Sequence, residues 1–293
     1  MHTLPDALLL HVLEYVTTLD LFKVARADCA LRTSAGIVLE ARTVRLRDRE
    51  PGLEEAVASA EPGATIVLSG RHKLDRDLVV TKTLRILGEP SALINGGGHG
   101  TVLRCDAPLV CLAHCRIGWT VGMGALPSRS VVEVNRNVRL LDCHLTMDHA
   151  PTSPVVSHAV TVAPGATFAA TRSTFHSWNG PTLKSRFADV TLTECDISGF
   201  GAPVAAQLRG GTAEFVGCTF NNEKMDGVAL WDAARAAFRN CRICDCARHG
   251  IAVRTSRGHL ELEHTVFERV EGTEVDYGSN DTPRIRHEMS MVS

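Results

Sequence analysis

The chain has no excess charge of either sign, few aromatic residues and no long hydrophobic run. Its 293 residues include 31 Lys and Arg and 33 Asp and Glu, interspersed along the chain, for a net charge of −2. This balance gives no general attraction to nucleic acid or to an anionic membrane. No apolar run approaches the ~20 residues of a membrane span, and the N-terminus lacks the basic start of a secretory signal. We therefore expect an intracellular protein, cytoplasmic or nuclear (in a host cell if it is viral), that binds neither nucleic acid nor membrane.

Motifs of common enzyme classes are also absent from the sequence. It contains no Gly-rich phosphate loop, no Ser-His-Asp arrangement and no basic stretch with interleaved aromatic residues. Its hydrophobic content of 44% is enough for a sizeable core. The length allows one large domain or two smaller ones.

One eight-residue template recurs between residues 65 and 275. Its first, third and eighth positions are mostly aliphatic or aromatic, and its sixth position is small. The sixth position is occupied in turn by Cys115, Cys143, Ser173, Cys195, Cys218, Cys241 and Thr265, and the last four intervals are 22 to 24 residues. Further alternating segments, such as Val160-x-Val162 and Ile251-x-Val253, lie between the templates. Such a pattern predicts a mainly β, right-handed parallel β-helix, in which each coil buries its inner face against the next.

The segment Gly52–Gly98 predicts the beginning of this solenoid. Apolar residues at helical spacing mark a helix over residues 53–60, and Pro62-Gly63 ends it. Short strands and glycines follow. This segment resembles the N-terminal entry of the pectin-lyase-like β-helix superfamily. The shared order is a helix with an Ala-rich face, Pro-Gly, a strand, Gly, a strand, Leu-x-Ile-x-Gly and Ile-x-Gly-Gly. The resemblance implies the fold and little about activity. We assign residues 49–275 to this domain and residues 276–293 to a frayed polar tail.

The small template position explains many of the cysteines. Ten cysteines in a chain without a secretory signal indicate thiols rather than disulfides. A corner between two strands leaves room for a small apolar group, and Cys behaves as one. We therefore expect Cys195, Cys218 and Cys241 to stack as buried free thiols in three successive coils.

The first 48 residues predict a small helical module. Leu4-Pro5-Asp6 precedes a leucine-rich helix that ends at Val16, and Asp20-Leu21 precedes an apolar helix that ends at Cys29. This order resembles the F-box, whose pattern is Leu-Pro, an acidic residue, a leucine-rich helix, Asp-Leu and an apolar helix ending in Cys. A helical cap without a partner is the alternative.

The F-box resemblance implies binding to the Skp1 adaptor of a cullin-RING ubiquitin ligase. At or near that contact it places Leu4, Pro5, Leu9, Val12, Leu13, Leu21 and Val24. Together the two segments resemble the F-box proteins that carry pectin-lyase-like repeats. That resemblance implies a non-catalytic, substrate-recruiting subunit whose β-helix recognises a protein substrate.

Two groups of residues have chemical potential, and each also has a structural explanation. Asp226-Gly227 and His249-Gly250 are similar to the Asp-Gly and His-Gly motifs of β-helix polygalacturonases, but the paired aspartates that such enzymes need are missing. Such dipeptides are also common at corners. Cys244, Cys246 and His249 are zinc-ligand types, whereas a closed structural site needs four ligands. We predict no catalytic residue, metal or cofactor.

Trp178 and Trp231 are candidate substrate contacts. Trp178 lies at a predicted corner and Trp231 ends a predicted strand, and aromatic residues often anchor protein partners. Packing over a loop is the equally simple alternative.

Two other functions stay open: a carbohydrate-active β-helix enzyme, which needs a cluster of acids on one outer face, and a purely structural interaction solenoid.

Overall fold

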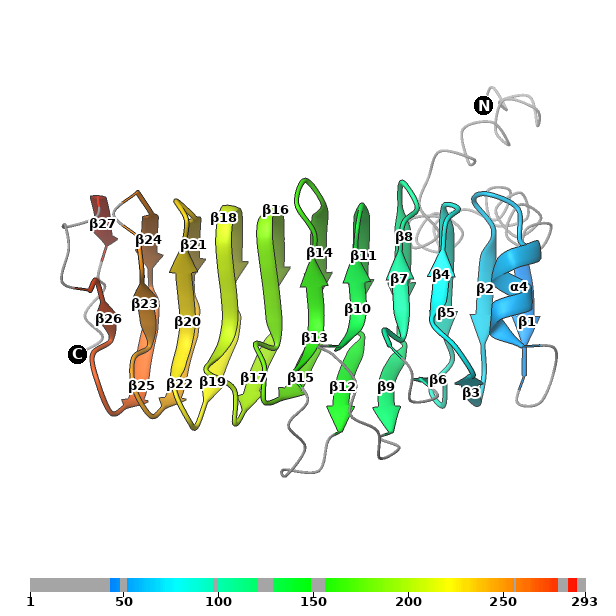
Figure 1. Ribbon diagram of the computed structural model, residues 1–293, viewed down its shortest axis with the longest axis horizontal. Helices are drawn as coiled ribbons and strands as arrows, with labels where there is room; N and C mark the ends of the chain where they lie inside the picture. Colours follow the sequence, from blue (N-terminus) through cyan, green and yellow to red (C-terminus); the bar gives the residue numbers. More distant parts are fainter. Residues whose placement is uncertain are drawn as a thin grey trace, which may run out of the picture.

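The computed structural model describes residues 43–47, 52–96, 100–120, 129–148, 156–255, 257–278 and 284–288. These residues form a parallel β-solenoid of about nine turns, with β1 near one end and β27 at the other (Figure 1). The predicted mainly β, parallel β-helix fold is thus confirmed. The adaptor-contact residues between Leu4 and Val24 lie outside the described residues, so the helical module stays a prediction.

Each complete coil contributes strands to three faces, which we name A, B and C in chain order. Face A contains β4 (Leu78–Val80), β7 (Leu103–Cys105), β10 (Arg129–Val134), β13 (Ser157–Val162), β20 (Asp226–Trp231), β23 (Ile251–Val253) and β26 (Val275–Asp276). Face B contains β1 (Thr43–Leu46), β2 (Thr65–Leu68), β5 (Leu84–Gly88), β8 (Val110–Ala113), β11 (Asn137–Leu141), β14 (Thr167–Thr171), β21 (Arg235–Arg239), β24 (His259–Glu263) and β27 (Arg284–Glu288). Two long strands run through faces A and B, β16 (Leu183–Thr193) and β18 (Val204–Val216), and join them into one 18-stranded sheet.

Face C is a separate nine-stranded sheet. Its strands are β3 (Arg71–Leu74), β6 (Leu93–Gly96), β9 (Arg116–Thr120), β12 (His144–Asp148), β15 (Thr174–Trp178), β17 (Asp196–Phe200), β19 (Thr219–Asn222), β22 (Arg242–Cys246) and β25 (Val266–Val270). The two sheets enclose one continuous hydrophobic core.

The first coil is closed by α4 (Leu53–Ser59), the one helix within the described residues and far too short to cross a membrane. Its apolar face is buried, with Leu53 at 2% exposure. The Nζ of Lys82 donates to the carbonyls of Ala58 and Ala60 at 2.6 and 3.0 Å, which satisfies acceptors that a helix end leaves free. The predicted cap helix is therefore present and tied to the solenoid.

The solenoid begins earlier than the sequence indicated. Strand β1 (Thr43–Leu46) precedes α4 and pairs in parallel with β2, although the sequence analysis placed these residues in the helical module. Strand pairing uses backbone groups, so β2 accepts this short segment, of which Leu46 alone is buried in the core.

The predicted thiol stack lies inside the solenoid. Cys195, Cys218 and Cys241 are 1 to 2% exposed and free. The residues two positions before them are direct partners, Thr193 with Val216 and Val216 with Arg239. The three thiols therefore occupy the same corner of three successive coils, as the repeat predicted.

The corner has two features that the sequence analysis missed. First, the residue before each small residue has a left-handed backbone, with φ between 47° and 62°, at His114, Asp142, Arg172, Glu194, Gly217, Asn240 and His264. Second, the small side chain often donates to a carbonyl of the preceding coil. The Sγ of Cys218 lies 3.4 Å from Leu192 O, and the Oγ1 of Thr265 lies 3.2 Å from Phe238 O. The position therefore selects a small side chain with a donor, which explains why Ser and Thr replace Cys there.

Burial should protect most thiols from alkylation. Among the described cysteines only Cys111 is half-buried. The others are buried, and burial raises the pKa of Cys246 to about 12, which removes the reactive thiolate at neutral pH. In a Cys29→Ser background, we expect iodoacetamide to modify Cys111 first and the remaining thiols only after unfolding, as followed by mass spectrometry without reductant. A disulfide-linked peptide, or rapid labelling that persists in Cys111→Ser, would contradict the buried-thiol stack.

Two glycines offer a matched test of the corners between faces. Gly217 and Gly211 both have left-handed φ values, 62° and 75°. A Cβ on Gly217 meets its nearest atom at 3.6 Å, whereas a Cβ on Gly211 would lie 2.2 Å from the carbonyl oxygen of Ala188. We expect Gly217→Ala to lower the free energy of unfolding by about 1–2 kcal/mol, and Gly211→Ala to lower it clearly more, because the backbone must move. Urea titration followed by circular dichroism measures both, and equal losses would rule out the close approach at Gly211.

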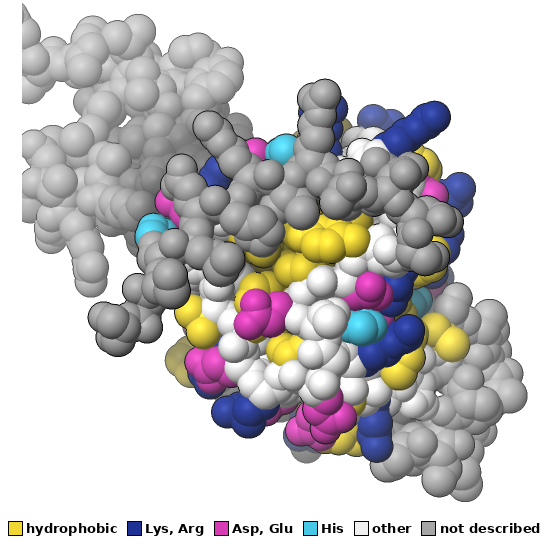
Figure 2. Space-filling model, turned by 90° about the vertical axis from the view of Figure 1, so that its left-hand side faces the viewer, with side chains coloured by type: hydrophobic (Ala, Val, Ile, Leu, Met, Phe, Trp, Pro, Cys, Tyr) yellow, Lys and Arg dark blue, Asp and Glu magenta, His cyan; other side chains and the backbone are white. Residues whose placement is uncertain are grey.

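The C-terminal segment is not wholly a frayed tail, which corrects the sequence analysis. β26 (Val275–Asp276) pairs with β23, and β27 (Arg284–Glu288) pairs with β24 from His259 to Glu263. The pairing again needs only backbone groups, which hydrophobic periodicity does not reveal. Figure 2 looks onto this end and shows hydrophobic side chains near its centre with charged ones around the rim.

Candidate functional site

The Asp-Gly and His-Gly pairs lie side by side at the beginning of face A. Because Val228 pairs with Ile251, Asp226-Gly227 stacks on His249-Gly250 of the next coil. A Cβ on Gly227 would lie 2.7 Å from the carbonyl oxygen of Gly250. The glycine is therefore required by the close approach of two backbones, which is the structural explanation weighed from the sequence.

The carboxylate of Asp226 has structural partners on the following coil. Its side chain is 8% exposed and accepts the backbone N–H of His249 at 3.2 Å. Guanidinium nitrogens of Arg248 and Arg254 lie 4.0 and 3.6 Å from its oxygens. Arg254 also binds Asp276 of β26 at 2.6 Å. These residues form an ion-pair network that links three successive coils, and Asp226 is one of its internal acceptors.

His249 belongs to the same network. Its Nδ1 lies 2.8 Å from the Oγ1 of Thr273 and its Nε2 lies 3.5 Å from Asp276. The backbone N–H of Gly278, together with Arg254, lowers the pKa of Asp276, which is therefore ionised at neutral pH. A general acid must hold a proton at the working pH, and Asp276 does not hold one at neutral pH.

The zinc-like residues do not converge. Cys246 is fully buried and Cys244 is 4% exposed. The thiol of Cys246 donates to the carbonyl oxygen of Cys244 at 3.4 Å, and His249 is bound to Thr273. Among the described residues no group of three or more His, Cys, Asp or Glu could hold a metal ion.

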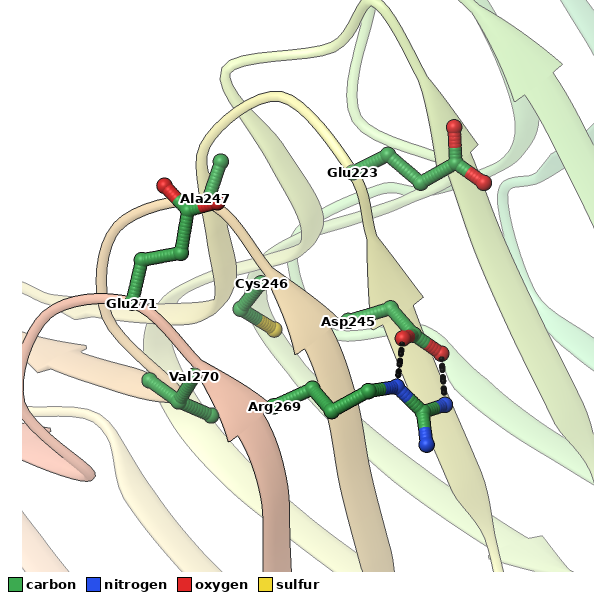
Figure 3. Close-up of a pocket in the computed structure, with 7 residues that line it drawn as sticks. All are labelled: Glu223, Asp245, Cys246, Ala247, Arg269, Val270 and Glu271. Atoms are coloured by element: carbon green, nitrogen blue, oxygen red, sulfur yellow. Dashed lines mark hydrogen bonds and ion pairs between the residues drawn. The ribbon is translucent and has the colours of Figure 1, made fainter.

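A pocket of about 440 Å³ lies at the end of face C, and the sequence analysis did not find it (Figure 3). Its lining comes from three successive coils and comprises Glu223, Asp245, Cys246, Ala247, Arg269, Val270 and Glu271. Two nitrogens of Arg269 bind both oxygens of Asp245 at 2.5 and 2.7 Å. This double contact holds the pKa of Asp245 below its usual range.

The acids of this pocket could have been found from the coil length. Asn222 pairs with Cys246, which pairs with Val270, so the residues that follow, Glu223, Ala247 and Glu271, occupy equivalent positions. They are 24 residues apart in each step. The signal was missed because one of the three positions is alanine and because Asp245 lies at a bulge.

The two candidate tryptophans have different surroundings. Trp178 on face C packs its ring 4.5 Å from that of Phe200 on the next coil and 6.1 Å from His176. The two rings are on directly paired residues of β15 and β17, so Trp178 packs across strands and not over a loop, and its role as a substrate contact stays a prediction. Trp231 on face A has the guanidinium of Arg209 over its ring at 5.4 Å, and its buried Nε1 has no hydrogen-bond partner.

Residues 158–288 match the family model described as right handed beta helix region. The body of the chain is a right-handed parallel β-helix. No curated protein matches the sequence. The match concerns the repeats and does not extend to the predicted helical module.

Solved structures share this fold at low identity. A pectin methylesterase from Aspergillus niger, in its penultimately deglycosylated form, has a TM-score of 0.57 at 11% identity, over 86% of this chain and 92% of that chain. Its deglycosylated form has a TM-score of 0.56 at 12% identity with the same coverage. The Dettilon tailspike protein gp208 has a TM-score of 0.52 at 11% identity, over 86% of this chain and 50% of that chain. At these identities the likeness shows the fold alone.

Proposed function

We propose that the protein is a non-catalytic recognition subunit of a ubiquitin ligase. In this proposal the F-box-like segment at Leu4-Pro5-Asp6 and Asp20-Leu21 binds a Skp1-like adaptor, and through it a cullin, while the β-helix binds a protein substrate. The observation that supports the non-catalytic part is the network around Asp226, in which Arg254 binds the carboxylates of both Asp226 and Asp276. A solenoid suits this role because its stacked coils present an extended, rigid surface. An intracellular location is part of the proposal.

The test is capture of the full-length chain by purified Skp1. The proposal expects a complex that also retains a cullin only when Skp1 is present. Failure of the full-length protein to bind Skp1 would remove the ligase assignment and leave an interaction solenoid.

Glycan cleavage is a second candidate, and the pocket of Figure 3 favours it. Glu223 and Glu271 lie two coils apart, so the ~4.8 Å strand spacing puts their backbones roughly 9.6 Å apart. Inverting glycosidases separate their two carboxyl groups by about 6.5–9.5 Å, and the carboxylates of Glu223 and Glu271 would have to turn toward each other from the directions seen in Figure 3. Against this function, the intervening Asp245 is neutralised by Arg269.

We expect no release of reducing ends from polygalacturonate and no loss of methyl ester from methylated pectin. A commercial pectinase and a pectin methylesterase serve as positive controls. If turnover is seen, Glu271→Gln and Asp226→Asn separate the possible sites. Loss of turnover in Glu271→Gln alone would establish the pocket as an active site and overturn the non-catalytic proposal.

A further inference from the structure

Two arginines lie on adjacent strands of face A with their side chains on the same outer surface. Arg186 of β16 is the direct partner of Arg209 of β18, and both are exposed. Neighbouring strands lie about 4.8 Å apart. Lys184, two residues before Arg186, faces the same side because side chains alternate along a strand. Figure 1 shows β16, β18 and β20 side by side in the half of the solenoid that leads to the C-terminus.

Among the described residues, Arg186 and Arg209 are the one pair of arginines that are direct partners on neighbouring strands. Arg104 pairs with Glu133 on the next strand at 3.2 Å, and Arg254 pairs with Asp276 at 2.6 Å. None of Lys184, Arg186 and Arg209 has a carboxylate oxygen within 4 Å among the described residues. Like charges directly opposite on neighbouring strands are destabilising. Arg186 and Arg209 face each other directly, so an anion bound from outside the chain would offset their repulsion.

Aromatic rings alternate with these cations. Phe187 is 49% exposed although it is large and apolar, and its φ of 47° lies in the left-handed region. A Cβ on Gly210 would lie 2.4 Å from the ring of Phe187, so this ring rests on the glycine backbone. Arg186 lies 5.9 Å from the centroid of that ring, and Arg209 lies 5.4 Å from that of Trp231. The equivalent residues of neighbouring coils, Gly165, Gly210 and Asp232, are also left-handed, so the backbone belongs to the corner and the exposed ring is the unusual feature of Phe187.

We propose that this strip, formed by Lys184, Arg186, Phe187, Arg209 and Trp231, binds an extended acidic segment of a protein partner. Arginine forks bind carboxylates in a bidentate manner, and Arg and Trp are enriched at binding hot spots. Three coils span roughly 10 Å between outer strands, which matches three to four residues of an extended peptide at about 3.3 Å per residue. The partner segment therefore carries two acidic side chains flanking a hydrophobic one.

The charge distribution favours a peptide over a nucleic acid. Recognition of nucleic acid uses a large basic surface that neutralises many phosphates, whereas the strip has three unpaired cations and the chain carries a net charge of −2. Three cations are enough to bind the two or three carboxylates of a short acidic segment. The inference rests on the proposed function, because it gives the chemical class of the substrate segment that the β-helix recognises.

The test is a selection from random decapeptides displayed on phage, using the immobilised full-length chain. We expect enrichment of peptides with two or more Asp or Glu around an aromatic or aliphatic residue. The best enriched peptide, labelled with fluorescein, should bind the wild type in fluorescence anisotropy and weaken as NaCl rises from 50 to 300 mM, because salt screens exposed charges. A labelled ten-nucleotide oligothymidylate should bind far less tightly.

Charge reversal localises the binding. Arg186→Glu with Arg209→Glu should weaken the peptide at least tenfold, while Arg139→Glu, an exposed outward arginine of β11 on face B, should leave it unchanged. Circular dichroism controls for folding. Failure to enrich acidic peptides, equal loss in both variants, or comparable binding of the oligonucleotide would each overturn the inference.

The inference and the proposed function fail in different ways. The Arg186→Glu, Arg209→Glu protein should still be captured by Skp1, because the strip lies on coils remote in sequence from the F-box-like segment. If Skp1 captures the chain but no acidic peptide binds, the strip is misassigned and the ligase role stands. If an acidic peptide binds the strip but Skp1 does not capture the chain, the ligase role fails and the strip stands.

Discussion

Replacing Leu9 and Leu13 together by alanine is expected to abolish Skp1 binding and leave the β-helix folded. The two leucines are four residues apart and share one face of the helix predicted over residues 7–16. A unit of fewer than 50 residues cannot easily bury so many leucines alone, so part of the apolar surface should be an interface. Burial of one leucine contributes about 1.5–3 kcal/mol, and loss of two should therefore cost several decades of affinity.

The measurement is a pull-down with purified Skp1 that compares wild type, the double variant and Leu10→Ala, a neighbouring leucine outside the predicted contact. The solenoid should keep its β signal in circular dichroism because it has its own cap, α4, held by Lys82. Undiminished binding of the double variant would mean that the interface is misplaced. Loss of the β signal would mean that the N-terminal helices are part of the solenoid cap.

Phe238→Ala is expected to cause the largest loss of stability in the β-helix. Phe238 is fully buried, with its ring centroid 4.8 Å from that of Phe215 and 5.7 Å from that of Phe220. Truncation removes these contacts and leaves a cavity between coils that are fixed by strand pairing on both sides. Such truncations cost about 3–5 kcal/mol.

The matched control is Phe187→Ala, the same chemical change at a site that is 49% exposed. It removes little buried surface and leaves the left-handed backbone with a Cβ as before, so the free energy of unfolding should change much less than in Phe238→Ala. Urea denaturation followed by far-UV circular dichroism measures both variants. A comparable loss in the two would show that the aromatic cluster of Phe238 is not the core of its coil.

The sequence predicted the repeat because inward burial is a local and periodic requirement. Each coil needs apolar side chains at alternate positions, so segments such as Val190-x-Leu192 mark the inner face wherever they recur. Cys218 could be placed in a corner from the same pattern. The donor role of that corner could not be predicted, because its acceptor, Leu192 O, belongs to the preceding coil.

The contacts within the candidate sites could be predicted from the sequence even less than the corner. The stacking of Asp226 on His249 follows from coils of equal length, but the role of Arg254, which binds both Asp226 and Asp276, depends on three strands meeting at one level. From the sequence, Asp226 and His249 could be read either as residues similar to a catalytic motif or as ordinary corner residues. Only the contacts show that the acid is an internal part of an ion-pair network.

The sequence alone determined that this chain forms a coiled, parallel β-structure with an apolar interior and small residues at one corner, because those features depend on side-chain type and spacing. The tertiary structure decided which outward residues meet. Arg186 faces Arg209, and Glu223 lies in one pocket with Glu271, because coil length, left-handed corners and bulges set their alignment. It also decided that Thr43–Leu46 and Arg284–Glu288 join the sheet, since an open strand edge binds backbone groups and places little demand on sequence.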